Sequence, residues 1–119
     1  MIKRTATAIA LLILAASAYG SHLGSAFDRV SGHLHDQEKF LHYLAATDVY
    51  KENCSGLSFI GTVLIIEGVK THDLDMDHLN DYGSYREGHR VSWLFYQLKN
   101  CKGIVERFKK FGLETTLNP

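Results

Sequence analysis

The feature that most constrains how this chain can fold is its pair of cysteines, Cys54 and Cys101, the only two in the sequence. A bridge between them would close a loop of about 48 residues, which the chain-entropy model values at about 4 kcal/mol. That is a large share of the ~5–15 kcal/mol that stabilises a typical domain. Neither cysteine lies in a CxxC, CxxCH or zinc-type cluster. We therefore predict one intramolecular disulfide, rather than a free thiol pair or an intermolecular bridge.

Residues 1–18 have the layout of a cleaved secretory signal peptide. Lys3 and Arg4 precede an apolar run from about Ala6 to Ala16, and small residues follow at the positions that signal peptidase reads. A membrane-spanning helix, the alternative, needs ~20 apolar residues, about twice this run. We expect cleavage after Ala18 and export to the periplasm or the cell exterior, where disulfides persist.

The charge and length of the remaining chain exclude several classes of protein. Loss of Lys3 and Arg4 leaves 11 basic against 13 acidic residues, a net charge near −2. A nucleic-acid-binding domain would show a basic stripe, and a protein of anionic membranes a polybasic patch. We therefore expect no nucleic-acid partner and no membrane insertion after cleavage. Residues 19–119 are long enough for one domain with its own core.

Two helical patterns occupy the first half of this domain. The segment 25–46 has a capping residue in Ser25, although Gly32 weakens the pattern and allows two helices joined near Ser31–His33. The segment 57–69 fits either a helix or a buried strand, and we favour a helix because no second strand-like run is present to pair with it. Its apolar residues on nearly every side predict that it forms the centre of the core, and Gly68 is placed to end it.

Two more helices are predicted in the second half. Ser84 and Glu87 form an S-x-x-E capping box at the start of the first. A core-facing stripe then follows at helical spacing, formed by Val91, Leu94, Phe95, Leu98 and Cys101. A short amphipathic helix over 103–112 carries Ile104, Val105, Phe108 and Phe111, with Gly112 placed to stop it. The sequence therefore predicts an all-α, single-domain bundle of about four to five helices with one intramolecular disulfide, which fixes the central 57–69 element to the capped C-terminal helix.

The stretch THDLDMDH raises the question of a metal site. His72, Asp73, Asp75, Asp77 and His78 supply ligand types that a divalent ion accepts. An EF-hand loop starting at Asp73 would need glycine and glutamate where the chain has His78 and Ser84, so that motif is absent. The alternative is a helix N-terminus, where aspartate carboxylates accept backbone amides, ahead of a short turn or helix at about 77–82.

A second candidate metal site lies in HDQEKFLH. On one continuous helix, His35, Glu38 and His42 would share roughly one side and offer three ligands to zinc. The alternative is an ordinary solvated helix face, with Glu38 and His42 an i,i+4 pair. We expect no resident cofactor elsewhere.

All seven histidines follow the predicted cleavage site. Because histidine gains charge between about pH 8 and pH 5, acidification would make the chain strongly positive. Such a change would suit a protein that binds or releases a partner under acid stress; the alternative is seven unrelated surface residues.

Catalytic motifs are absent: the chain has no nucleophile elbow, HExxH or phosphate loop. Aromatic residues instead gather on one predicted helix, where Tyr85, Trp93 and Tyr96 lie off the apolar stripe. They would serve as an exposed anchor for a partner, or else pack against the N-terminal helices.

In architecture, the chain resembles the small periplasmic acid-stress chaperones of enteric bacteria. The resemblance rests on the leader, the size of the helical part and the cysteine spacing, and it covers Cys54 to about Gly112. Small disulfide-stapled immunity proteins, which block toxins, have a similar layout. Both imply a non-enzymatic module whose partner is another protein, acting as a stress chaperone or as an inhibitor. A metal-binding module that uses the His/Asp-rich segments is the alternative.

Overall fold

The computed structural model describes residue 28 and residues 30–118. The proposed signal peptide, its cleavage site after Ala18 and the predicted cap at Ser25 lie outside the described residues. Within residue 28 and 30–118, no helix is both long and apolar enough to span a membrane.

Helices make up nearly all of the described chain. Residues 30–35 are helical, followed by α3 (Gln37–Asn53), α4 (Phe59–Thr71) and α5 (Gly83–Lys110). Two short 3₁₀ helices, η2 (Met76–Asp81) and η3 (Glu114–Thr116), connect or follow them. The β-type pairing among these residues is an isolated bridge between Leu57 and Leu117. The all-α prediction is confirmed, and so is the choice of a helix over a strand for 57–69.

The predicted disulfide between Cys54 and Cys101 is present, with Cα atoms 5.7 Å apart. Cys54 caps the C-terminus of α3, so the bridge joins the end of α3 to α5. The sequence pattern predicted a link from the 57–69 element to the C-terminal helix. The covalent link instead fixes the helix that precedes that element.

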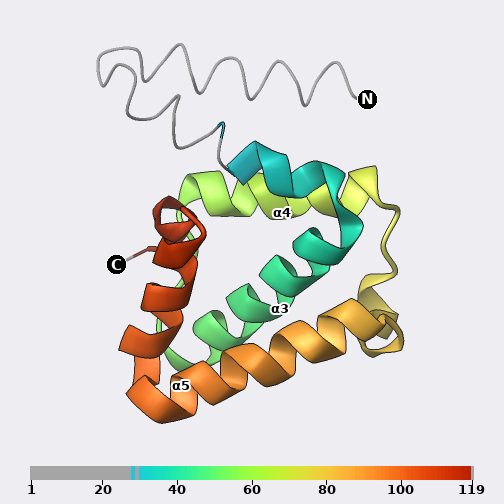
Figure 1. The fold of residues 1–119 in the computed structure, drawn as a ribbon. Helices are drawn as coiled ribbons and strands as arrows, with labels where there is room; N and C mark the ends of the chain where they lie inside the picture. The colour runs from blue at the N-terminus through green and yellow to red at the C-terminus, as the bar shows by residue number, and fades with distance from the viewer. Residues whose placement is uncertain (1–27, 29, 119) are drawn as a thin grey trace, which may run out of the picture.

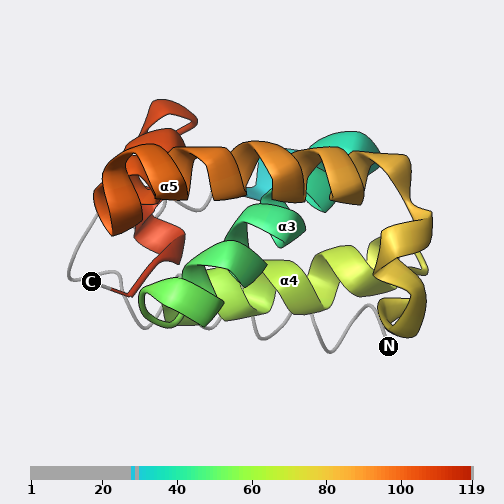
Figure 2. The ribbon, with the colours of Figure 1, turned by 90° about the horizontal axis from the view of Figure 1, so that it is seen from below.

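The centre of the core is α3. Figure 1 shows α3 crossing the middle of the molecule, and in Figure 2 it lies between α4 and α5. Its buried side chains include Phe40, Leu44 and Val49. The prediction that 57–69 forms the core centre is therefore wrong: α4 buries one face only and leaves Phe59 63% and Ile66 49% exposed.

The N-terminal pattern divides at Asp36 rather than near Ser31–His33. Asp36 is extended (φ −103°, ψ 110°), and its carboxylate accepts a hydrogen bond of 3.0 Å from the Lys39 amide. An aspartate in this conformation caps a new helix by satisfying an amide that lacks an intrahelical partner. The cap, not the exposed Gly32, sets the boundary between residues 30–35 and α3.

Gly68 does not end α4, which continues to Thr71. A Cβ at position 68 would lie about 2 Å from the ring of Phe40, so the glycine is where the aromatic ring of α3 packs onto the backbone of α4. Gly68 allows close packing between α3 and α4, and the prediction that it ends α4 is wrong.

The capping box predicted at Ser84 and Glu87 does not form. Helix α5 begins at Gly83, after Tyr82, with no side-chain hydrogen bond at its cap. Glu87 instead forms an ion pair of 2.7 Å with Arg90. Ser84 lies inside the first turn of the helix and not at its N-cap, so the reciprocal bonds of a capping box cannot form.

The two C-terminal helices predicted from the sequence are the two arms of α5, which bends at Asn100 (φ 57°, ψ −146°). The bend turns residues 101–110 across the end of α3, as Figure 1 shows. The second arm buries Ile104 and Phe108, whereas Phe111 is 52% exposed. Gly112 has φ 72° and ends the helix as predicted. The Leu113 amide bonds the Phe108 carbonyl and the Gly112 amide the Lys109 carbonyl, which is a Schellman motif.

Candidate functional site

The first arm of α5 packs on α3 through small residues. Gly88 and Ser92 are buried, and a Cβ at Gly88 would lie 2.8 Å from the His42 Cα and 3.2 Å from the Ala45 Cβ. The two helix backbones therefore approach more closely than large side chains would permit. At this contact the close fit of small residues positions α5 against α3, and a stripe of large apolar residues does not.

The predicted core-facing stripe is consequently wrong for three of its five members. Leu94, Phe95 and Leu98 are 47%, 40% and 72% exposed. Val91 and Cys101 are half-buried. The first arm of α5 buries Tyr85, Gly88 and Ser92, and it leaves the large side chains of the two leucines and of Phe95 exposed to solvent.

Arg107 links this exposed surface to the second arm of α5. Its guanidinium carbon lies 5.5 Å from the ring centre of Phe95 and 5.9 Å from that of Phe111, within range of a cation–π interaction with each. Burial lowers the pKa of Arg107 below its usual range because desolvation disfavours the charged form. We define the α5 face as Leu94, Phe95, Leu98, Arg107 and Phe111.

The charges of the chain are unevenly divided. Helix α5 holds seven basic residues against Glu87 and Glu106, a net charge of +5, and because the whole chain sums to zero the remainder carries −5. The basic residues are Arg86, Arg90, Lys99, Lys102, Arg107, Lys109 and Lys110. The exposed apolar surface therefore belongs to the element that carries most of the positive charge of the chain.

A cavity of about 240 Å³ opens beside this face, between α3 and the second arm of α5. Its apolar lining includes Tyr43, Phe108 and Leu113, all buried. Burial raises the pKa of the Tyr43 phenol above its usual 10.0 because desolvation disfavours the charged form. Lys39 and Arg107 are the two permanently charged residues among those that line the cavity within the described chain.

The three aromatic residues proposed as a partner anchor are not equivalent. Tyr85 is buried, and its hydroxyl donates a hydrogen bond of 2.7 Å to Asp48, so it does not belong to an exposed anchor. Trp93 is 39% exposed and stacks on the half-buried Tyr96, with ring centres 5.2 Å apart. This pair remains a candidate contact surface, separate from the α5 face.

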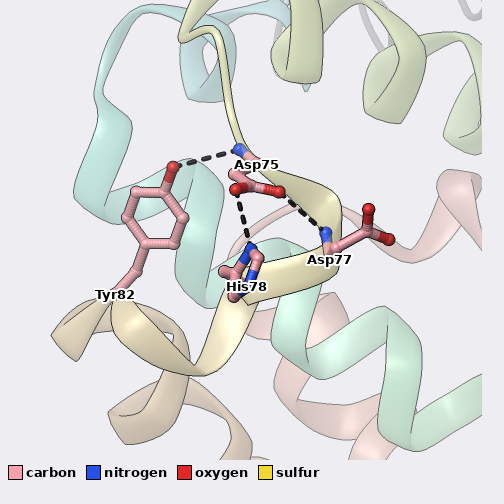
Figure 3. A network of polar contacts seen from close by, with 4 residues as sticks. All are labelled: Asp75, Asp77, His78 and Tyr82. Carbon is pink, nitrogen blue, oxygen red and sulfur yellow. Dashed lines mark hydrogen bonds and ion pairs between the residues drawn. The ribbon is translucent and has the colours of Figure 1, made fainter.

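Within the THDLDMDH stretch, Asp75 is the N-terminal cap of η2 (Figure 3). Asp75 accepts a hydrogen bond of 3.1 Å from the Asp77 amide and one of 2.8 Å from His78 Nδ1, and its own amide donates to the Tyr82 hydroxyl. The hydrogen bond from His78 is the main cause that lowers the pKa of Asp75. In Figure 3 the Asp77 carboxylate points away from the Asp75 carboxylate.

The other members of that stretch lie elsewhere. His72 caps α4, and its Nε2 contacts the Leu34 carbonyl, which ties α4 to residues 30–35. Asp73 has a positive φ of 50° and is exposed. The interpretation of this stretch as a cap and a short helix is therefore the one that the structure bears out.

The continuous helix that the second candidate metal site requires is interrupted at Asp36. His35 ends the segment 30–35, whereas Glu38 and His42 belong to α3, so the i, i+3, i+7 spacing does not exist in space. Throughout residue 28 and 30–118, no three His, Cys, Asp or Glu side chains gather in a way that could hold a metal ion.

Comparison with protein-family models, with curated proteins and with solved structures found no match for this chain.

Sequence reasoning missed the residues that now define the site. Leu94 and Leu98 were placed in the core because they fit a helical stripe, and Lys39 and Arg107 were not singled out. The signal available was Gly88 and Ser92, which share a different side of the same helix at i, i+4. The net charge of the whole chain also concealed the +5 on α5.

Proposed function

We propose that this chain is an exported, non-enzymatic protein-binding module that holds its partner against the α5 face. The observation that carries the proposal is the solvent exposure of Leu94, Phe95 and Leu98 on a helix that is already packed on its other side. Exposed apolar side chains that lie together on one surface mark interaction sites in soluble proteins. The disulfide and the leader-like residues 1–18 support export.

The partner is a protein that presents apolar side chains ringed by carboxylates. The apolar residues of the face supply the buried contact, and the +5 charge of α5 favours an acidic surround. Arg107, which lies within cation–π range of Phe95 and Phe111, would pair with one of those carboxylates once the contact excludes water.

A binding experiment with synthetic helices tests this. The probe is an amphipathic 18-residue peptide with leucine on one face and glutamate on the other, compared with the same peptide carrying lysine in place of glutamate. We expect the glutamate peptide to bind and the lysine peptide not to. The variant Leu94→Ser/Leu98→Ser should lose binding at least about tenfold, because two apolar contacts are removed.

The control is Ile66→Ser on α4, which changes an apolar residue about as exposed as Leu94 and outside the face. Binding should be unchanged in this variant. Equal binding by the wild type and by Leu94→Ser/Leu98→Ser would overturn the proposal, and so would tighter binding to anionic lipid vesicles than to the acidic peptide.

A stress chaperone and a stoichiometric inhibitor would both use such a face. Light scattering of an acid-denatured client at pH 3–5, with and without the protein, separates them. Suppression of aggregation that depends on Leu94 and Leu98 supports the chaperone role. If aggregation is not suppressed at an equimolar ratio of protein to client, and peptide binding is retained at neutral pH, the inhibitor role is supported.

A further inference from the structure

We propose that the cavity between α3 and the second arm of α5 binds a small amphiphilic anion, that is, a carboxylate carried on an apolar tail. This site does not depend on the partner that we propose for the α5 face, although Arg107 and Phe111 border both. The two sites are therefore tested with different substitutions.

The floor of the cavity suits an apolar tail. Tyr43, Ala46, Phe108 and Leu113 line it and are each at least 96% buried. Tyr43 and Phe108 meet edge to face with ring centres 5.8 Å apart, which gives the floor a fixed shape. Ligand sites in proteins combine such an apolar lining with a few polar groups that fix orientation.

The rim of the cavity suits an anionic head group. Lys39, His42 and Arg107 line it, and none of the nine described lining residues is acidic. Neither Lys39 nor Arg107 takes part in any of the four ion pairs found among the described residues. Their charges lie beside an apolar hollow without a carboxylate from this part of the chain.

Arg107 is the strongest recognition group of the three. It is partly withdrawn from water, and its guanidinium carbon lies within cation–π range of the rings of Phe95 and Phe111. A guanidinium offers two parallel N–H donors to a carboxylate, and holding it in place in advance reduces the entropy lost on binding. A bound carboxylate would also offset the desolvation that lowers the Arg107 pKa.

The volume limits the size of the ligand. At roughly 30 Å³ for each water-sized group, about 240 Å³ accepts roughly eight such groups. A linear carboxylate of about eight carbons in all, such as octanoate, fills this space with its head at the rim. A ligand of about ten heavy atoms should bind with a dissociation constant of roughly 0.1–1 mM.

Titration of the disulfide-bonded protein with octanoate, followed by calorimetry and by amide chemical shifts, tests the proposal. We expect octanoate to bind and to shift the amides of Ala46 and Leu113. Octylammonium, which has the opposite charge, and acetate, which lacks the tail, should not bind. Equal affinity for octanoate and octylammonium would overturn the proposal, as would shifts confined to Leu94 and Leu98.

Two substitutions probe the head and the tail separately. Lys39→Glu should weaken octanoate binding at least about tenfold; it places glutamate three residues after the Asp36 cap, which favours the helix start. Ala46→Leu should abolish binding by filling the cavity. Lys70→Glu, the same charge change at an exposed site on α4, is the control. Thermal melts confirm folding of each variant.

The outcome is independent of the proposed function. Leu94→Ser/Leu98→Ser should bind octanoate as the wild type does, and Ala46→Leu should still bind the acidic peptide. Octanoate affinity that is unchanged in folded Lys39→Glu and in folded Ala46→Leu would overturn the cavity site alone.

Discussion

Tyr85 of α5 and Asp48 of α3 are joined by a hydrogen bond of 2.7 Å, in which the buried phenol donates to the carboxylate. It is a polar contact between α3 and the first arm of α5, which also approach each other closely at Gly88. Tyr85→Phe should lower the free energy of unfolding by about 1–2 kcal/mol, because the bond is lost to a charged acceptor. Urea denaturation measures this. Tyr82→Phe, whose hydroxyl accepts a bond on the exposed η2 turn, is the control and should cost less.

The same tyrosine predicts a loss of stability at alkaline pH. Burial, and then the hydrogen bond to Asp48, raises the pKa of Tyr85 above its usual 10.0. The folded state holds the phenolic proton of Tyr85 more tightly than the unfolded state does. The contribution of Tyr85 to the free energy of unfolding is therefore complete below about pH 10 and is lost as the pH rises above it. Urea midpoints should fall above about pH 10. The fall should be smaller in Tyr85→Phe; an identical fall in both proteins would contradict the assignment.

Gly88 should tolerate no side chain. Gly88→Ala is expected to cost about 1–3 kcal/mol, since the new methyl group would lie 2.8 Å from the His42 Cα and would push α5 away from α3. Gly32→Ala is the matched control: a Cβ at position 32 would meet no atom within 4 Å, so alanine should stabilise the helix by up to about 1 kcal/mol. Chemical denaturation of both variants gives the comparison.

The bend of α5 requires a backbone conformation that asparagine adopts at a cost. Asn100 lies at φ 57° and ψ −146°, a region that glycine occupies freely. Asn100→Gly should raise the unfolding free energy by about 1 kcal/mol, whereas Asn100→Ala should lower it. Asn53→Gly, at the helical end of α3, should be destabilising instead, because it removes a hydrogen bond to the Val49 carbonyl. A destabilised Asn100→Gly would contradict the bend.

The disulfide should be a major source of stability. Thiol titration of the unfolded, unreduced protein should find no reactive thiol, and two per molecule would contradict the bridge. Cys54→Ser/Cys101→Ser should unfold about 2–5 kcal/mol more easily than the oxidised wild type. A reducing agent should destabilise the wild type and leave this variant unchanged.

The sequence predicted the helices and the disulfide because both follow from local information. Periodicity identified α3 and both arms of α5, the lack of a second strand-like run decided for a helix at α4, and the isolated pair Cys54 and Cys101 left one simple pairing. The orientation of α5 could not be found in this way. A stripe such as Leu94 and Leu98 shows that a helix is amphipathic, but which side faces inward depends on the shape of α3 at Ala45 and on the room that Gly88 leaves.

The boundaries and the site depended on contacts that are distant in sequence. Asp36 and Ser84 are both plausible caps, and only the surrounding structure shows that the first is used and the second is not. Arg107 could not be recognised as a site residue because its neighbours Phe95 and Phe111 come near it only after α5 bends at Asn100.

The small-residue contact at Gly88 has a consequence for how such a protein would change over time. Folding depends on the side of α5 that packs against α3, whereas the proposed recognition depends on its exposed side. Substitutions at positions 94 and 98 can therefore change the choice of partner with little loss of stability. Positions 88 and 92 have no such freedom.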